Sequence, residues 1–80
     1  MLSGVGFVGR LDGISGAAAV SAFMKHGWGV RRNNKGHTIM KKDGHRAHLS
    51  IPNHRTLKTG LLRAQISAAR LTVDQFLDAL

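Results

Sequence analysis

Residues 27–42, GWGVRRNNKGHTIMKK, predict two short strands joined by a polar turn. Asn, Gly and Lys favour turns over strands, so we expect the turn to span residues 31–36. Trp28 and Val30 are separated by a single residue, and this spacing predicts that both lie on the buried face of the first strand. A second strand is expected over residues 38–42. The two strands together predict a hairpin around which the other elements are arranged.

A third strand is predicted after the hairpin. Ala47, Leu49 and Ile51 alternate with polar residues, which places an apolar face on the core and a basic face in solvent. The Asp-Gly pair at residues 43–44 predicts the turn that leads into this strand. Pro52 is expected to end it, because proline cannot continue a hydrogen-bonded ladder.

A helix is predicted before the strands, over residues 15–26. Ser15 can cap the amide groups of its first turn, and Gly27 is placed to end it in a left-handed conformation. Phe23 and Met24 lie on its apolar face, so we expect both side chains in the core.

Two more helices are predicted after the strands. One covers residues 59–69, with Thr59 as its cap and with Leu62 and Ile66 on its buried face. A shorter one follows the capping-box pattern at residues 72–75. The order helix, three strands, helix and short helix indicates an α+β fold, in which a three-stranded antiparallel sheet has helices packed on one face. The other face, with basic and His side chains, is expected to stay open.

The length and composition indicate one small domain with a modest core. We assign residues 14–80 to this domain and residues 1–13 to a glycine-rich extension, for which a flexible tail and an added edge strand both stay open. The chain has no cysteine, which excludes disulfides and thiolate metal sites and suits a cytoplasmic protein. No apolar run approaches the ~20 residues that span a bilayer, so we expect no membrane association.

The positive charge is concentrated in the middle of the chain. The formal charge is +8, and ten of the twelve Lys and Arg residues lie between Lys25 and Arg63, where Asp43 is the only acid. Such a patch favours a polyanionic partner, most often nucleic acid. A charge that serves only solubility is the alternative. Anionic membranes attract basic amphipathic helices, whereas most of this charge lies in strand and turn sequence.

The acids and histidines argue against metal-dependent chemistry. Asp74 and Asp78 lie on one turn of a predicted helix and indicate a surface feature, and the chain has only two other acids. Paired-carboxylate catalysis and a two-metal nuclease site therefore lack ligands. His45 and His48 point to opposite faces of a strand, and without cysteines the five histidines predict no metal site. We expect no cofactor.

His37 is the candidate catalytic residue for a metal-free route. RNA carries its own nucleophile, the 2′-hydroxyl, so a protein needs only a positioned acid or base and cations for the developing charge. Imidazole groups suit this task because they titrate near neutral pH. The densest basic cluster of the sequence lies around His37 and consists of Arg31, Arg32, Lys35, Lys41 and Lys42. The alternative, that His37 only hydrogen-bonds a phosphate or its own turn, stays open.

Several short segments resemble one known family when they are taken together. They are Gly27-Trp28, Val30-Arg31-Arg32, Lys35-Gly36-His37-Thr38-Ile39-Met40, Asp43-Gly44, Ile51-Pro52 with His54, Leu57-Lys58-x-Gly60-x-Leu62-Arg63, Ala69-x-Leu71-Thr72 and Phe76-Leu77. In this order and spacing, over residues 14–80, the chain resembles the HicA family of toxins. These are small mRNA interferases with a fold like a double-stranded-RNA-binding domain.

The resemblance implies a function and a set of residues. The family's catalytic histidine falls on His37, preceded here by Gly36 instead of the usual Ser or Asp. The resemblance also implies cleavage of mRNA, which blocks translation, and a HicB-type antitoxin partner that covers the active surface.

We therefore predict a metal-independent endoribonuclease toxin of a type II toxin–antitoxin system, located in the cytoplasm. The residues expected to contact RNA are Arg31, Arg32, Lys35, Gly36, Thr38, Lys41, Lys58 and Arg63. A non-catalytic RNA-binding module of the same fold, and an inactive toxin that acts through protein interactions, stay open as alternatives.

Overall fold

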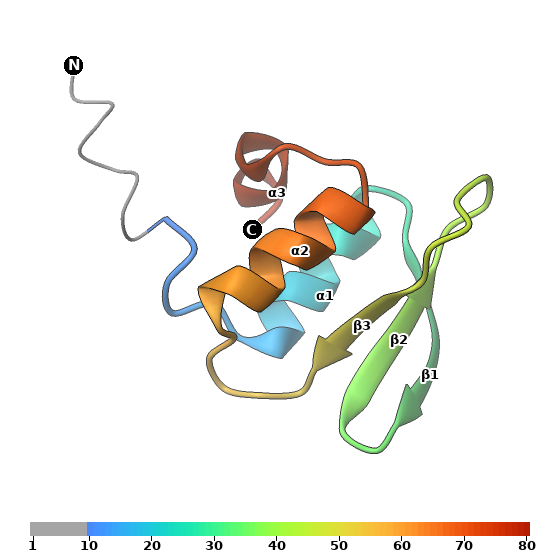
Figure 1. Cartoon of the computed structure of the whole chain (residues 1–80), viewed down its shortest axis with the longest axis horizontal. Helices are drawn as coiled ribbons and strands as arrows, with labels where there is room; N and C mark the ends of the chain where they lie inside the picture. The colour runs from blue at the N-terminus through green and yellow to red at the C-terminus, as the bar shows by residue number, and fades with distance from the viewer. Residues whose placement is uncertain (1–9) are drawn as a thin grey trace.

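The computed structural model describes residues 10–80. Its elements follow in the order α1 (Gly16–Lys25), β1 (Gly29–Asn34), β2 (His37–Lys41), β3 (Leu49–Pro52), α2 (Thr59–Ala68) and α3 (Val73–Asp78). The strands form one antiparallel sheet in the order β1-β2-β3. Figure 1 shows the helices gathered on one side of this sheet. The predicted α+β fold and its order of elements are confirmed.

Helix α1 begins and ends as its sequence predicts. The backbone N–H of Ala18 donates to Ser15 Oγ (3.0 Å), which satisfies an amide that has no partner within the helix. The chain leaves the helix through Gly27, whose φ of +93° lies in the left-handed region that glycine adopts without strain. Lys42 Nζ then donates to the carbonyl oxygen of His26 (2.7 Å) and satisfies one of the last carbonyl groups.

The buried face of α1 differs from the predicted one. Phe23 is fully buried as expected, but Met24 is 53% exposed, and the core is filled instead by Ala19 and Ala22. Ala19, Ala22 and Phe23 follow the i, i+3, i+4 spacing of one helical face, whereas Met24 is rotated about 100° from Phe23. The prediction for Met24 was wrong because α1 is apolar on two faces and only one of them meets the sheet.

The β1–β2 hairpin turns more tightly than predicted. Strand β1 continues to Asn34, so the turn consists of Lys35 and Gly36 alone, not of residues 31–36. Both turn residues have positive φ values, +50° and +83°, as the two-residue type I′ turn requires. The twist of a type I′ turn matches the right-handed twist of the two strands. The strands therefore stay paired up to the turn, and the polar residue Asn34 remains hydrogen-bonded in the ladder.

Strand β1 is an edge strand and is exposed along its whole length. Trp28, just before it, is buried (2% exposed), but Val30 is 45% exposed, so the prediction that both are buried holds only for Trp28. The pairing register shifts between Val30 and Arg32, which leaves Arg31 as an extra residue without a partner in β2.

Strand β3 is shorter than its alternating pattern suggests. Leu49 and Ile51 are fully buried and Pro52 is the last residue of the strand, as predicted. Ala47 lies before the strand and is exposed, so its predicted place in the core was wrong. The reason is the connection after β2: a turn closed by the His45 N–H and the Lys42 carbonyl oxygen (3.1 Å) is followed by residues that do not pair with β2.

Helix α2 covers the free edge of β3. Gln65 Oε1 accepts the backbone N–H of Ser50 (3.1 Å), which protects this edge from pairing with another strand. Leu62 and Ile66 are buried as predicted. Thr59 is the first helical residue and not the cap. Lys58 occupies the N-cap position, and its side chain makes no capping hydrogen bond.

Helix α3 completes the core from the far side of α1. The predicted capping box is confirmed, because Thr72 N–H donates to Gln75 Oε1 (2.8 Å) and Gln75 N–H donates to Thr72 Oγ1 (3.1 Å). Phe76 is fully buried, and its ring centroid lies 5.0 Å from that of Phe23. Helices α1 and α3 are therefore joined through an aromatic pair.

The residues before α1 also pack against the domain. Leu11 and Ile14 are buried in the core, and Arg10 forms an ion pair with Asp74 in α3. The remainder of the predicted glycine-rich extension, residues 1–9, lies outside the described residues. Its two possible forms, a tail or an edge strand, therefore stay predictions.

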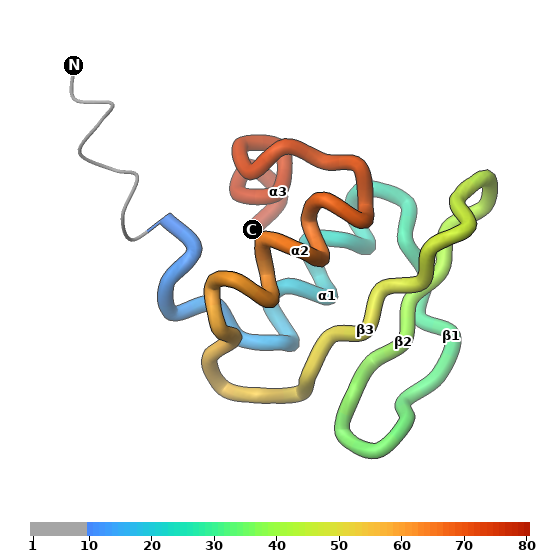
Figure 2. The backbone as a smooth tube through the Cα atoms, viewed as in Figure 1, coloured from blue at the N-terminus to red at the C-terminus, as the bar shows by residue number. Residues whose placement is uncertain are grey.

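The start of α1 is held against the chain that leaves β3. Gly16 N–H donates to the His54 carbonyl oxygen (2.9 Å), and Leu57 N–H donates to that of Ile14 (2.8 Å). A Cβ atom on Gly16 would overlap the carbonyl oxygen of Pro52 and lie 3.1 Å from its carbon, so only glycine fits here. Figure 2 shows this chain passing the start of α1 before it enters α2.

Candidate nucleic-acid interface

His37 is the first residue of β2, directly after the type I′ turn, and its side chain is half-buried. Nδ1 of the ring lies 3.3 Å from the carbonyl oxygen of Lys35. A carbonyl oxygen only accepts, so Nδ1 carries the hydrogen in this contact. The lone pair of a neutral His37 is then on Nε2, the ring nitrogen that can act as a base or, when protonated, as an acid.

The turn that carries His37 is fastened to the loop after β3. Asn53 N–H donates to the Gly36 carbonyl oxygen (2.8 Å). Thr38 Oγ1 lies 2.9 Å from the side-chain amide of Asn33 and 2.9 Å from that of Asn53. Both amide atoms are the Oδ1 oxygens, so the single hydroxyl hydrogen of Thr38 is donated to Asn33 or to Asn53, or is shared between them. These contacts connect β1, β2 and the loop, and they fix the backbone on which His37 is mounted.

Thr38 and His37 point to opposite faces of the sheet. Thr38 is 7% exposed and pairs with the buried Ile51, which places its side chain on the core side. The structure thus places the predicted RNA-contacting residue Thr38 beneath the turn, with its hydroxyl already bonded. Gly36 lies in the exposed turn itself, next to Lys35.

The face of the sheet opposite the core, called the open face below, includes Arg32, His37, Ile39, Lys41 and Ser50. Alternate residues of β2 share this face, and Arg32 and Ser50 are the partners of Ile39 in β1 and β3. Arg32 is therefore a diagonal neighbour of both His37 and Lys41, at about 7–8 Å across the strands. This register places the exposed residue Arg32 on the same face as His37, one diagonal step away.

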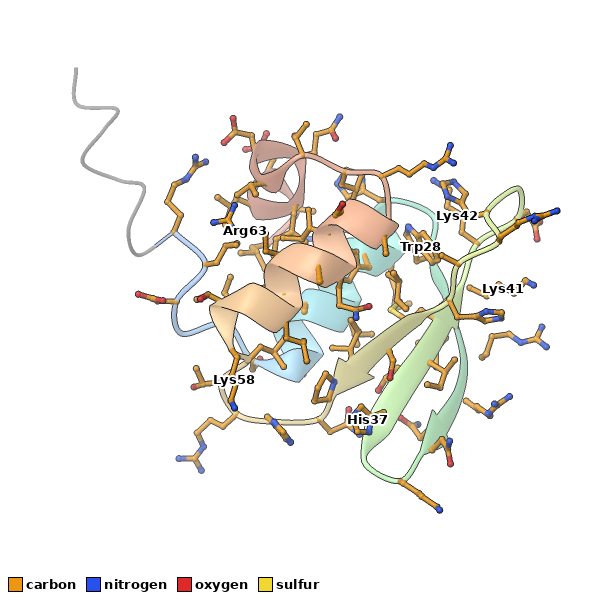
Figure 3. All side chains as sticks on the ribbon, in the orientation of Figure 1. Trp28, His37, Lys41, Lys42, Lys58 and Arg63 are labelled. Atoms are coloured by element: carbon orange, nitrogen blue, oxygen red, sulfur yellow. The ribbon has the colours of Figure 1, made fainter. Side chains whose placement is uncertain are left out.

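The basic residues around His37 in the sequence are separated in space. Lys41 is four residues further along β2, or about 13 Å from His37 at the usual rise. Lys42 lies beyond it and donates to His26. Figure 3 shows Lys41 and Lys42 at the opposite end of the sheet from His37. We call residues 35–38 the turn end of the sheet and residues 41–48 the far end.

The other predicted contact residues are divided between the two sides of α2. Lys58 is exposed at the N-cap and lies at the same end of the molecule as His37 (Figure 3). Arg63 is about 200° around the helix from Gln65, which contacts β3. It therefore points away from the sheet, and the structure does not bring it to His37. Arg31, at the register shift, is exposed.

A second histidine lies close to the turn end. His54 follows the Asn53 residue that is bonded to Gly36, and with Ser15, Ala17, Asn53 and Arg55 it lines a shallow hollow beside the start of α1. The sequence placed His54 in a polar loop but gave no sign of its neighbours. Its position follows from the pairing of His37 with Pro52, a long-range contact that local sequence patterns do not report.

Two further features of the described residues concern metals and membranes. Within residues 10–80, no three His, Asp or Glu side chains come together as a group that could hold a metal ion. None of the helices in the same region has both the length and the apolar character needed to cross a membrane.

Comparison with known families assigns the class of protein. A family model described as HicA toxin of bacterial toxin–antitoxin systems matches residues 16–71, from α1 to the residues just after α2. The matched region is most of the 80-residue chain. The protein is thus a toxin of the toxin–antitoxin type, and it belongs to the HicA toxin family. Membership implies an antitoxin partner in general terms. No curated protein and no solved structure gives a significant match.

Proposed function

We propose that this protein is an endoribonuclease toxin that cleaves mRNA without a metal ion and so blocks translation. The observation that carries the proposal is the position of the His37 ring. It lies half-buried on the open face, bonded through Nδ1 to its own turn, with Nε2 left for a substrate. RNA supplies the nucleophile, so the protein must add only a base and a cationic surface.

The proposed reaction needs no co-reactant other than water. Nε2 of His37 takes the proton of a 2′-hydroxyl group, and the 2′-oxygen attacks the adjacent phosphorus. The bond from phosphorus to the 5′-oxygen breaks, which leaves a 2′,3′-cyclic phosphate on one fragment and a 5′-hydroxyl on the other. The departing 5′-oxygen takes a proton from solvent, and His37 returns its proton to solvent.

Cations at the turn end would bind the RNA phosphates and stabilise the negative charge that develops during cleavage. Arg32, the diagonal neighbour of His37, is suited to a bidentate contact with the phosphate that is attacked. Lys35 in the turn and Lys58 at the start of α2 would hold flanking phosphates, and the uncapped amides of α2 add to the attraction for anions. Thr38 acts indirectly, by holding the turn.

The open face is also the surface on which we place the antitoxin. A HicB-type antitoxin that covers the open face would block His37 and Arg32 together, since both side chains lie on it. The formal charge of +8 favours an acidic covering surface. Inhibition would then need no change in the fold of the toxin.

The proposal is tested first by replacing His37. His37→Ala is expected to reduce cleavage of a purified mRNA by about 10²–10⁴-fold, the usual contribution of a general acid–base group. The matched control is His48→Ala, which removes an exposed imidazole just before β3. RNA cleavage is followed on gels, and growth arrest is scored on expression of each variant. Equal cleavage by the His37→Ala protein and the parent would refute the assignment of His37.

The metal-free step is tested by chelation. Cleavage by the parent protein in excess EDTA is expected to proceed at its original rate, because the nucleophile, the base and the cations all come from RNA and protein. The fragments should end in a 2′,3′-cyclic phosphate, which mass spectrometry identifies. Loss of cleavage in EDTA that returns on adding Mg²⁺ would indicate a metal-dependent nuclease instead.

A further inference from the structure

A second cationic surface lies at the far end of the sheet. The chain between β2 and β3 and the end of α2 enclose a partly open hollow of about 400 Å³. It is lined by Gly44, His45, Arg46, Ala47, Ala68 and Arg70. Within residues 10–80, the one ion pair joins Arg10 to Asp74, so neither Arg46 nor Arg70 is neutralised by an acid there. The far hollow, as we call it, is therefore a concave site with two exposed guanidinium groups.

Arg70 occupies a backbone position that favours glycine. Its N–H donates to the Ser67 carbonyl oxygen (2.9 Å), and Leu71 N–H donates to that of Ile66 (3.1 Å), the two bonds of a Schellman motif. The residue after the C-cap of this motif is left-handed, and Arg70 has a φ of +62°. Arginine is strained there and glycine is not. The strain suggests that the guanidinium has a use beyond ending the helix.

His45, in the wall of the hollow opposite Arg70, packs against the core residue Trp28. The His45 ring lies over Trp28, with centroids 5.2 Å apart and planes at 59°. Trp28 is 2% exposed and part of the core, and its Nε1 has no hydrogen-bond partner among residues 10–80. The turn that precedes Arg46 is closed by the bond between His45 and Lys42. The hollow thus combines a supported aromatic ring with two guanidinium groups.

We propose that the far hollow binds one nucleotide of the RNA substrate, with its phosphate between Arg46 and Arg70 and its base against His45. Small-molecule sites typically occupy about 300–1,000 Å³, a range that includes this hollow. Guanidinium groups suit phosphate, and imidazole rings are among the surfaces on which unpaired RNA bases stack. A single carboxylate from an acidic protein would leave the ring and most of the volume unused, so these observations favour a nucleotide.

The hollow and His37 lie at opposite ends of β3, which gives the proposal a length requirement. Pro52 pairs with His37, and Ala47, five residues earlier, lines the hollow. The separation is about 16 Å along the strand direction, so an RNA strand that reaches both places must span several nucleotides. The inference rests on the proposed function, because a strand that reaches both places would have its scissile bond at His37 and a remote nucleotide in the hollow.

The test uses Arg70→Gly, a change that removes the guanidinium and should also relieve backbone strain. The probes are 2′-O-methyl RNA oligonucleotides of 12 and 3 nucleotides, which bind but lack the attacking hydroxyl, so binding is measured apart from cleavage. Arg70→Gly and Arg46→Ala should each weaken binding of the 12-mer about tenfold, as loss of a charge-assisted contact does. The parent should bind the 12-mer more tightly than the 3-mer, because only the longer strand reaches both places, and the melting temperature of Arg70→Gly should be equal to or above that of the parent.

Lys25→Ala is the matched control, since it removes one positive charge from the exposed last turn of α1, outside the lining of the hollow. Equal 12-mer affinity in Arg70→Gly and the parent would overturn the proposal, as would an equal loss in Lys25→Ala or equal affinity of the parent for the 3-mer and the 12-mer. Unchanged RNA affinity with weaker binding of the antitoxin would assign the hollow to an acidic protein surface and also overturn it. None of these outcomes depends on whether His37→Ala still cleaves RNA. Failure of the nucleotide site can therefore be distinguished from failure of the proposed endoribonuclease function.

Discussion

The turn end and the far end of the sheet are built from similar residues but are held in different ways. At the turn end, Gly36 and Thr38 are bonded to the loop after β3, and that loop is bonded to the start of α1. At the far end, the chain turns at Gly44 and leaves residues 46–48 exposed before it enters β3. A catalytic imidazole needs a fixed position, whereas a phosphate contact tolerates movement. The difference in fastening therefore matches the two proposed roles.

The largest expected effect comes from breaking the fastening at the turn end through Gly16. Gly16→Ala would force a methyl group into the backbone of Pro52, the partner of His37 in β3. We expect a loss of about 3 kcal/mol in the free energy of unfolding, because neither backbone segment can yield easily. Chemical denaturation measures the change, and cleavage should fall with it.

Gly60→Ala is the matched control for Gly16→Ala. It adds the same methyl group inside α2, where no atom of the described residues lies within 4 Å of the added atom. The expected result is a gain of about 0.5–1 kcal/mol, because alanine favours the helix. If both variants had the same stability, the close contact between α1 and Pro52 would not be important for the fold.

A smaller effect is expected from removing the hydroxyl group that joins β2 to its neighbours. Thr38→Val keeps the shape of the side chain but leaves the amides of Asn33 and Asn53 without this partner. We expect a loss of about 1–2 kcal/mol in unfolding free energy and a clear decrease in cleavage rate, with RNA affinity kept. Thr56→Val, at an exposed loop position, is the control. Full cleavage activity in Thr38→Val would show that His37 does not need this network.

The features that could be predicted from the sequence depend on groups close together in the chain. The cap at Ser15, the left-handed Gly27 and the capping box at residues 72–75 each involve backbone amides within three or four residues. Leu49 and Ile51 were found by alternation because their strand has one buried face. His37 was singled out as a candidate because it is an imidazole in a basic segment, and its catalytic role stays a prediction.

The features that could not be predicted depend on contacts between distant segments. Met24 and Ala22 are both apolar, and only the packing of α1 decides which is buried. The direction of Arg63, on the side of α2 away from the sheet, follows from the contact of Gln65 with β3, while the sequence suggested an RNA contact. The bonds of Thr38 join residues 5 and 15 positions apart. Local patterns carry no signal for such pairs.

The smallest expected effect on stability comes from the turn glycines, and it compares the turn end with the far end most directly. Gly36 and Gly44 both have positive φ values, +83° and +85°, and a Cβ on either would meet no atom within 4 Å. Alanine at each position should therefore cost about 1 kcal/mol through backbone strain alone.

Gly36→Ala should also slow RNA cleavage, because strain relief would move the turn on which His37 is mounted. Gly44→Ala should lose the same free energy of unfolding but keep the parent's cleavage rate on a short RNA. Thermal melts measure the stability of both variants, and single-turnover kinetics measure their cleavage rates. Equal cleavage rates in the two variants would mean that the turn end does not position the imidazole, and the contrast between the ends would then have no catalytic meaning.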